Sequence, residues 1–430
     1  MSETAGRKTF RICLQAMIDH IQNGIEDGTY AKDSYLPSES AFAKQFQLSN
    51  NTVRKGLEQL VNEGWIVKVD KVGSRVTGTT YHKQTTLSVI GYPMNKRDLD
   101  FTHLIESFQT LYPSIRVAWN DQIAPDTFMP GKYVDHISES MEKGTVDVFL
   151  LQHVHFREFL ERGHTSLLEP ISPNKDVYSF LNDAFTIECR RTYAQPIIFS
   201  PVMLGYNRDH FRQANIAEPD SGWTWDDLIR AAIQLTISNE RNGFYFYQTG
   251  ENRWPLLTVQ SGMPFAAKGT DEGERDYRGT RLMDGIRLYG EIIRNGSFFP
   301  HYMSETPHDT SRLFLEGKIS MTLITYTSLN DLKHSDIDYD ISAIPFMYTP
   351  ITLITMMGMI VNKNSRNKEA AQLFADYIAS RETQETIRRR TLSLPAMKQV
   401  AEMPIKDHFN RPLHYSLFRK IIPSYRTHSL

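Results

Sequence analysis

The sequence predicts a multidomain protein in which a small N-terminal α+β winged helix-turn-helix precedes a larger α/β body. Three observations support this prediction. The chain is 430 residues long, which exceeds what one hydrophobic core usually serves. Residues 1–77 show three helical hydrophobic repeats followed by two short strand patterns, whereas from residue 86 onward strands alternate with helices. Hydrophobic residues make up 40% and charged residues 23% of the chain, as in folded globular proteins.

Each N-terminal element has its own start or stop signal. Gly28 ends the first apolar repeat, and Gly64 is a C-cap for the third. Pro37 cannot continue a helix, and Ser38 and Ser49 are favourable N-caps for the helices that follow them. The predicted elements are helices over residues 7–27, 38–48 and 49–64 and strands over residues 65–69 and 74–76. Three helices and a hairpin in this order give a winged helix-turn-helix.

The third helix carries the chemistry expected of a DNA-reading element. A helix that follows a tight turn can enter the major groove, where Asn bonds adenine edges and Arg bonds guanine or phosphate. Residues 1–77 hold ten basic and nine acidic side chains, a net charge of +1. So small a charge predicts few phosphate contacts per copy, and hence two copies on DNA. Periodicity alone fits equally well a small helical domain with a solvated charged face.

Three short motifs decide between these interpretations: Leu-Pro-Ser-Glu at 36–39, Leu-Ser-Asn-Asn-Thr-Val-Arg-Lys at 48–55 and Leu-Val-Asn-Glu-Gly at 60–64. Together they resemble the DNA-binding domain of the GntR family of bacterial regulators. The resemblance implies that DNA is contacted by Ser38, Asn50, Asn51, Thr52, Arg54, Lys55, Lys71 and Gly73. Asn50 stands where the family usually has Arg, Lys71-Val72-Gly73 replaces its usual Gly-Lys-Gly wing, and Gly56 replaces a preferred Ala.

Residues 78–85 are short and polar and are predicted to form a linker to a sensor body over 86–430. In this body, residues 147–151 form a continuous apolar run typical of a central parallel strand. Thr224 should cap a helix whose first turn holds Asp226 and Asp227. The uncharged stretch 341–362 contains two prolines and is interpreted as two buried strands, not as a membrane helix.

The body shows no catalytic pattern. There is no zinc-protease helix, phosphate-cradling Gly-Lys loop, nucleophile elbow or dinucleotide glycine motif, so we expect no catalytic residue, no metal and no cofactor. His153 and His155 are two residues apart and are more consistent with surface or cleft positions than with metal ligation. The chain has only two cysteines and no apolar export signal near its start, which favours the cytoplasm.

Ordered matches over residues 86–400 resemble the maltose-binding-protein-like extracellular solute-binding proteins of bacterial importers. The matching segments are 104–108, 112–117, 147–150, 167–171, 195–196, 205–211, 223–228, 314–321 and 358–362. The resemblance implies a two-lobed, type II periplasmic-binding-protein-like α/β fold with a ligand cleft. The chain should cross between lobes near 195–200, 346–356 and 391–396. The first lobe is expected to comprise about 86–197 and 300–346, and the second about 200–299 and 356–430.

Such clefts bind sugars by stacking them on aromatic rings and bonding their hydroxyls. By the resemblance, the residues expected at the cleft are Tyr92, Gln152, His153, Phe199, Ser200, Trp254 and Tyr326. For each of them, core packing or solvent exposure is the alternative.

The two halves together predict a homodimeric regulator that binds a palindromic operator and represses carbohydrate genes until a sugar or oligosaccharide enters the cleft. An activator would differ in the sign of the ligand effect. Two rivals belong to other classes. An aminotransferase-like enzyme would need a Schiff-base lysine near a Gly-Leu-Arg run, which is absent, and a transport binding protein would have no affinity for DNA.

Overall fold

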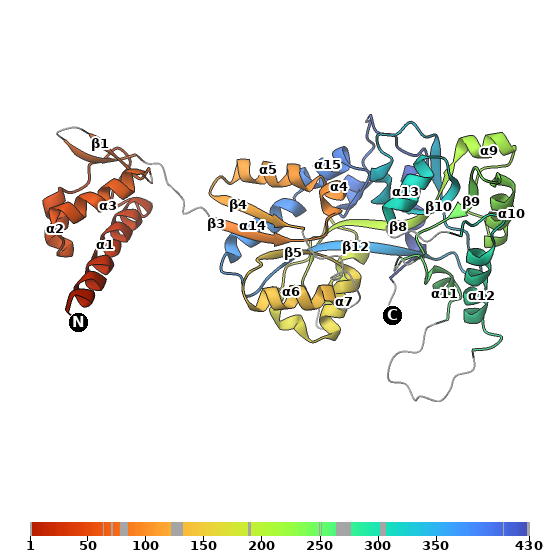
Figure 1. The fold of residues 1–430 in the computed structure, drawn as a ribbon, viewed down its shortest axis with the longest axis horizontal. Coiled ribbons are helices and arrows are strands. Elements are labelled where there is room, and N and C mark those ends of the chain that lie inside the picture. Colours follow the sequence, from red (N-terminus) through yellow and green to blue (C-terminus); the bar gives the residue numbers. More distant parts are fainter. Residues whose placement is uncertain are drawn as a thin grey trace. The chain divides into compact units, whose positions relative to one another are not determined.

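The computed structural model describes residues 2–62, 64–69, 72–77, 85–121, 132–187, 191–248, 250, 252–263, 277–301, 307–406 and 408–427. The chain divides into two compact units (Figure 1). The first comprises residues 1–86 with 112–116, and the second residues 87–111 with 117–430. Residues 78–84 of the predicted linker lie outside the described residues.

The first unit has the predicted three helices and hairpin. Its elements are α1 (Ser2–Glu26), α2 (Glu39–Phe46), α3 (Asn50–Asn62), β1 (Ile66–Val69) and β2 (Gly73–Val76). The two strands pair antiparallel, with Ile66 opposite Val76. Ser38 caps α2 as predicted, since its hydroxyl accepts a hydrogen bond from the Ala41 N–H. The core is a single cluster formed by Met17, Ile18, Ile21, Leu36, Phe42, Leu48, Val53, Leu57, Leu60, Trp65, Ile66 and Val76.

Gly56 lies where α3 crosses α1. A Cβ at this position would come 2.4 Å from Met17 Cε and 3.0 Å from Leu14 Cδ1. The missing side chain therefore lets the two helices approach closely, which offsets part of the helix propensity that glycine lacks.

The second unit is built on one mixed sheet with the strand order β4-β3-β5-β12-β8-β10-β9. Its strands are β3 (Thr85–Ile90), β4 (Ile115–Asn120), β5 (Val148–Gln152), β8 (Gln195–Asn207), β9 (Asn242–Tyr245), β10 (Ile319–Thr325), β11 (Tyr339–Ser342) and β12 (Thr352–Val361). The remaining short strands are β6 (Thr186–Ile187), β7 (Arg191–Thr192), β13 (Leu394–Pro395) and β14 (Tyr425–Arg426).

The long strands β8 and β12 belong to both halves of this sheet. Residues 195–201 of β8 pair with β12, and residues 202–207 pair with β10 and β11. The far end of β12, residues 357–361, pairs with β5 of the first half. Two lobes therefore share a continuous sheet and are joined where β8 and β12 run side by side (Figure 1).

Helices cover both lobes. The first lobe carries α4 (Asn95–Leu99), α5 (Phe101–Leu111), α6 (Lys132–Glu142), α7 (His153–Glu161), η2 (His164–Leu167), α8 (Ser179–Ala184) and α14 (Lys368–Ala379). The second lobe carries α9 (Arg208–Ala214), α10 (Trp225–Leu235), α11 (Leu256–Gln260), α12 (Arg281–Arg294) and α13 (Pro307–Leu315). The other helical segments are η3 (Ser328–Asp331), α15 (Arg381–Arg390), α16 (Lys398–Ala401), η4 (Tyr415–Arg419) and η5 (Ile422–Ser424).

These helices sit on both faces of the sheet. In the first lobe, α5 and α14 lie on one face and α6 and α7 on the other (Figure 1). In the second lobe, β9 packs against α10 so tightly that a Cβ on Gly243 would lie 1.8 Å from the Ala232 carbonyl oxygen. The start of α10 has the predicted cap, because Thr224 and Asp227 bond each other's backbone N–H groups. The two-lobed α/β fold is as predicted.

The strand pairing corrects the assignment of segments to lobes. Residues 300–346 were expected in the first lobe, but β10 and β11 pair with the part of β8 that lies in the second. Residues from 356 were expected in the second lobe, but residues 357–361 pair with β5, and α14 packs on α5 in the first. The physical reason is that β8 carries the chain outward and β12, antiparallel to it, carries it back, so no return occurs near residue 300.

The uncharged stretch 341–362 forms the end of β11, a connection and β12, as predicted. Among the helices in the described part of the chain, none is long and apolar enough to cross a bilayer.

Candidate functional site

The exposed face of α3 carries the polar side chains predicted to meet DNA. Asn50, Asn51, Arg54 and Lys55 are all exposed. Ser49 begins the helix, because its hydroxyl accepts a hydrogen bond from the Thr52 N–H at 3.3 Å. The helix therefore presents two amides and two cations from its first turns, as a recognition helix requires.

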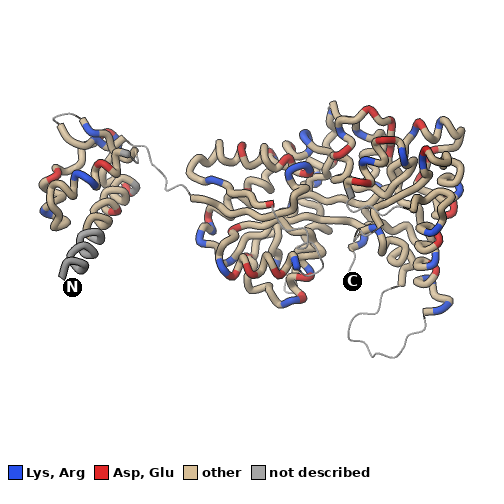
Figure 2. Tube along the Cα trace, viewed as in Figure 1, with Lys and Arg blue, Asp and Glu red and all other residues tan. Residues whose placement is uncertain are grey.

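Glu39 of the Leu-Pro-Ser-Glu motif orients one of these cations. Arg54 Nη2 donates to Glu39 Oε2 at 2.9 Å, and Lys68 Nζ lies 3.9 Å from the other oxygen of this carboxylate. The carboxylate offsets part of the positive charge on this surface. Figure 2 accordingly shows Lys and Arg interspersed with Asp and Glu in the first unit.

The other predicted DNA residues differ in their placement. Ser38 is exposed and caps α2, and Gly73 is exposed at the start of β2 with a positive φ of 140°. Thr52 is only 4% exposed, and its hydroxyl lies 2.8 Å from Ser49 Oγ. This burial corrects the expectation that Thr52 reaches DNA, because the small hydroxyl is used in the helix cap. Lys71 lies outside the described residues.

A cavity of about 220 Å³ lies in the second unit where the two lobes meet. Its wall includes residues of the first lobe, of the second lobe and of both shared strands. The polar members are Arg97, Asp98, Gln152, His153, Ser200, Tyr247, Asn252, Arg253, His308, Thr325, Thr327, Ser328, Asp331 and Thr355. Eight of these fourteen polar residues carry a hydroxyl or amide group, apolar side chains line much of the remaining wall, and Tyr247 is its main aromatic ring beside the buried Phe199.

Four of the seven predicted ligand residues line this cavity: Gln152, His153, Phe199 and Ser200. Gln152 ends β5, and His153 begins α7. Ser200 lies in the middle of β8, and Phe199 next to it is fully buried against other aromatic rings. The strand ends that the sequence singled out therefore do reach the cavity.

The other three, Tyr92, Trp254 and Tyr326, do not line it. The Tyr92 hydroxyl lies 2.7 Å from His155 Nδ1, and its ring stacks on Tyr133, so Tyr92 belongs to the core beneath the cavity. Tyr326 is fully buried, and its hydroxyl donates to the Tyr415 carbonyl at 2.7 Å. Trp254 is half-buried outside the cavity wall. These aromatic side chains support the site but do not form its surface.

The two histidines that lie two residues apart have separate partners, since His155 pairs with Tyr92. His153 and His155 lie in the first turn of α7 and contact different groups. The described residues contain no cluster of three or more His, Cys, Asp or Glu side chains that could hold a metal ion.

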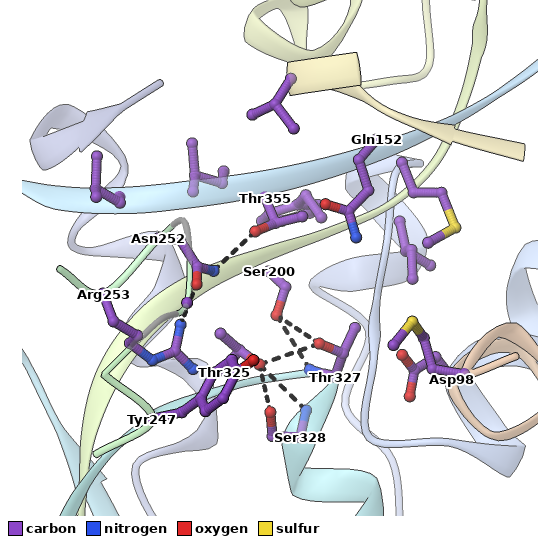
Figure 3. A pocket seen from close by; sticks show the side chains of 18 of the residues that line it. Asp98, Gln152, Ser200, Tyr247, Asn252, Arg253, Thr325, Thr327, Ser328 and Thr355 are labelled. Carbon is purple, nitrogen blue, oxygen red and sulfur yellow. Dashed lines mark hydrogen bonds between the residues drawn. The ribbon is translucent and has the colours of Figure 1, made fainter. Parts of the chain in front are cut away.

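A hydroxyl cluster lies at the centre of the cavity wall. Ser200 Oγ accepts a hydrogen bond from the Thr327 N–H at 3.0 Å. Thr325 Oγ1 lies 2.7 Å from Ser328 Oγ and 3.1 Å from Thr327 Oγ1 (Figure 3). The sequence could have indicated this cluster, since three hydroxyl residues flank Tyr326 in the segment already singled out.

A group of charged side chains forms one end of the cavity. Arg97 bonds Asp98 at 2.6 Å and Asp331 at 2.5 Å, and His308 Nδ1 lies 3.4 Å from Asp331. Burial raises the pKa of Asp98 to about 6 in spite of the Arg97 charge. The hydrogen bond to Asp331 raises the pKa of His308. Both carboxylates at this end therefore share one arginine, and Asp331 also contacts the His308 imidazole.

Arg253 and Asn252 lie on the opposite side of the cavity (Figure 3). Arg253 Nη1 donates to Asn252 Oδ1 at 2.6 Å, and Nε donates to the Leu323 carbonyl at 3.2 Å. The Asn252 amide donates in turn to Thr355 Oγ1 at 2.9 Å. Arg253 is 9% exposed, and burial lowers its pKa to about 10, which leaves it charged at neutral pH.

Comparison with known families accounts for both units. Residues 15–76 match the gntR family of bacterial regulatory proteins, and residues 130–385 match the bacterial extracellular solute-binding protein family. The chain belongs to the bacterial extracellular solute-binding protein family and carries a gntR-family domain. The solute-binding match spans both lobes around the cavity.

Individual relatives of this solute-binding chain are distant. A binding protein of Brucella abortus is 22% identical over 354 residues, which are 76% of this chain and 79% of that protein. The sn-glycerol-3-phosphate-binding periplasmic protein UgpB of Escherichia coli is 24% identical over 232 residues, 50% of this chain and 51% of that protein. The structure of a Listeria monocytogenes ABC substrate-binding protein in complex with cycloalternan aligns with a TM-score of 0.66 at 19% identity, covering 81% and 89% of the two chains.

This solute-binding chain therefore combines the DNA-binding domain of a bacterial regulator with the fold of a binding protein. That combination is the composition of a ligand-sensing regulator. Both matched families are non-enzymatic.

Proposed function

We propose that this protein is a cytoplasmic, homodimeric repressor that binds a palindromic operator and is released from it by a polyhydroxylated small molecule, a sugar or oligosaccharide. One observation carries the proposal: a cavity whose polar wall residues are mostly hydroxyl and amide side chains lies between the lobes of a chain that also carries a gntR-family domain. Such groups bond the closely spaced hydroxyls of carbohydrates. The relative from Listeria monocytogenes, bound to cycloalternan, supports this class of ligand.

Residues from both lobes line the cavity, which suggests how the ligand acts. Gln152 and His153 come from the first lobe, whereas Tyr247 and Asn252 come from the second. A ligand that touches both sets favours the closed arrangement of the lobes by its differential affinity. Closure in a dimer would alter the spacing of two recognition helices, which must match half-sites about 34–36 Å apart.

DNA contact is assigned to the exposed residues Ser38, Asn50, Asn51, Arg54, Lys55 and Gly73 of the first unit, and to Lys71, which lies outside the described residues. The net charge of +1 on residues 1–77 gives each copy few phosphate contacts, which supports binding as a dimer. On this basis we expect each copy to add only a shallow salt dependence to the affinity for DNA, and single half-sites to bind much more weakly than palindromes.

Fluorescence anisotropy of the full chain with palindromic duplexes from the DNA flanking its own gene tests the proposal. The expected result is tight binding without ligand and release when a stabilising sugar is added. Failure of the ligand-free protein to bind any such duplex would exclude a repressor, and binding that appears only with ligand would indicate an activator. A chain with no DNA affinity even at low salt would be a transport protein.

A further inference from the structure

Arg253 is a buried cation with no counter-charge of its own. Its hydrogen bonds to described residues go to two neutral oxygens, the Leu323 carbonyl and the Asn252 amide oxygen. Among the residues that the structure describes, no carboxylate lies within 4.0 Å of its guanidinium, and Nη2 has no acceptor. Arg97, the other arginine among the described residues of the cavity wall, is paired, because it bonds both Asp98 and Asp331.

An unpaired buried charge is costly, so its presence in a cavity wall calls for an explanation. Removing a charge from water is strongly unfavourable unless an opposite charge or hydrogen bonds replace the solvent. A guanidinium has five N–H donors in a plane, and only two of those of Arg253 are used by the described residues. The remaining donors form an edge that fits the two oxygens of a carboxylate or phosphate.

Among the described residues, the surroundings of Arg253 add donors without adding negative charge. Asn252, Thr325, Thr355 and Tyr247 share this side of the cavity, whereas Asp98 lies on the opposite side (Figure 3). Both carboxylates of the acidic end already bond Arg97, whereas no carboxylate of the described residues pairs with Arg253, so the Arg253 side is the positive pole of the cavity. An anionic group would therefore be drawn to this side, while ligand hydroxyls face the Ser200 and Thr327 cluster.

We propose that the ligand is a polyhydroxylated compound with an anionic oxygen group, a phosphate or a carboxylate, that binds the Arg253 guanidinium. This inference rests on the proposed function only in taking the cavity as the ligand site. It narrows the proposed ligand class from sugars in general to polyhydroxylated compounds that carry an anionic group.

Thermal denaturation of the full chain with inorganic phosphate or with acetate, each against chloride at equal ionic strength, tests the inference. Either anion should raise the melting temperature of the wild type. The matched polyols glucose, glucose 6-phosphate and glucuronate then separate the two anion classes, with an expected affinity at least ten-fold higher for one charged compound than for glucose.

Two variants localise the effect. Arg253→Met removes the charge, and Asn252→Asp places a carboxylate where the amide oxygen now lies 2.6 Å from Nη1, which neutralises the guanidinium without deleting it. Both should lose at least ten-fold in anion affinity. Arg294→Met removes an exposed arginine on α12 and should leave the anion effect unchanged. If Arg253→Met fails to fold, Asn252→Asp still tests whether the anion effect depends on the Arg253 charge.

The outcomes separate this inference from the proposed function. No stabilisation of the wild type by either anion, or stabilisation that persists in both variants, would overturn the inference, and so would equal affinity for glucose and its charged derivatives. If a charged compound binds through Arg253 but leaves operator binding unchanged, the inferred anion site is supported and the proposed repressor function is refuted. If glucose binds, its charged derivatives do not, and glucose releases the operator, the proposed repressor function is supported and the inferred anion site is refuted.

Discussion

Replacing Ser200 with alanine tests whether the hydroxyl cluster holds the junction between the lobes. Ser200 is 2% exposed, and its hydroxyl accepts the Thr327 N–H at 3.0 Å. Alanine removes the acceptor, so the part-buried Thr327 N–H loses its partner. Such a loss costs roughly 1–3 kcal/mol, and we expect the free energy of unfolding to fall by about 2 kcal/mol.

The same change should weaken ligand binding, because Thr327 and its neighbours Thr325 and Ser328 are held in place by this bond. Urea unfolding followed by tryptophan fluorescence measures the stability. Ser140→Ala is the control, because this half-buried serine on α6 donates its hydroxyl to the His136 carbonyl of its own helix; its stability is expected within about 0.5 kcal/mol of wild type. A Ser200→Ala variant as stable as this control would refute the reasoning that the bond is structural.

Three further predictions concern the DNA surface, the core and pH. Arg54→Ala should weaken operator binding by roughly 1–3 kcal/mol in anisotropy titrations, whereas Lys44→Ala on α2 should have little effect. Gly243→Ala should destabilise the second unit by about 3 kcal/mol or more in calorimetry, because its Cβ would meet the backbone of α10; unchanged stability would contradict this packing. Burial lowers the pKa of His155 to about 4, so the unfolded chain takes up the proton first as pH falls below 6.5 and stability is lost. Between pH 6.5 and 5 this loss should be about 2 kcal/mol, and His155→Gln should remove it; an unchanged pH slope in this variant would show that another group is responsible.

Local signals predicted the elements of the first unit well. Ser38 and the Thr224 capping pair start their helices as expected because caps act within one turn. The apolar run at 147–151 lies largely in strand β5, because a continuous run of buried side chains is itself a local signal. The resemblance to known families supplied the two-lobed arrangement, which no local pattern contains.

The direction of the lobe crossings could not be read from local patterns. It depends on which strand lies beside which, and β12 meets β8 only in the folded sheet, about 150 residues away along the chain. Without that pairing, the sequence of residues 300–346 does not indicate to which lobe the segment belongs.

The candidate site was missed by one residue in two places. Tyr326 is buried in the core while Thr325 and Thr327 on either side line the cavity, at the point where β10 ends and a turn begins. Trp254 attracted notice as an aromatic, but Asn252 and Arg253 reach the cavity. The Arg97–Asp331 pair joins residues 234 apart, so only the fold could show it.

The coupling between the cavity and the operator is the central claim, and one titration tests it most directly. The full chain is bound to a labelled palindromic duplex and titrated with the compound that stabilises it most in a thermal screen of sugars and sugar phosphates. The account predicts release of the duplex, with the half-effect at the compound's dissociation constant and loss of the effect in Asn252→Asp. Saturation of the cavity with no change in operator affinity would contradict it.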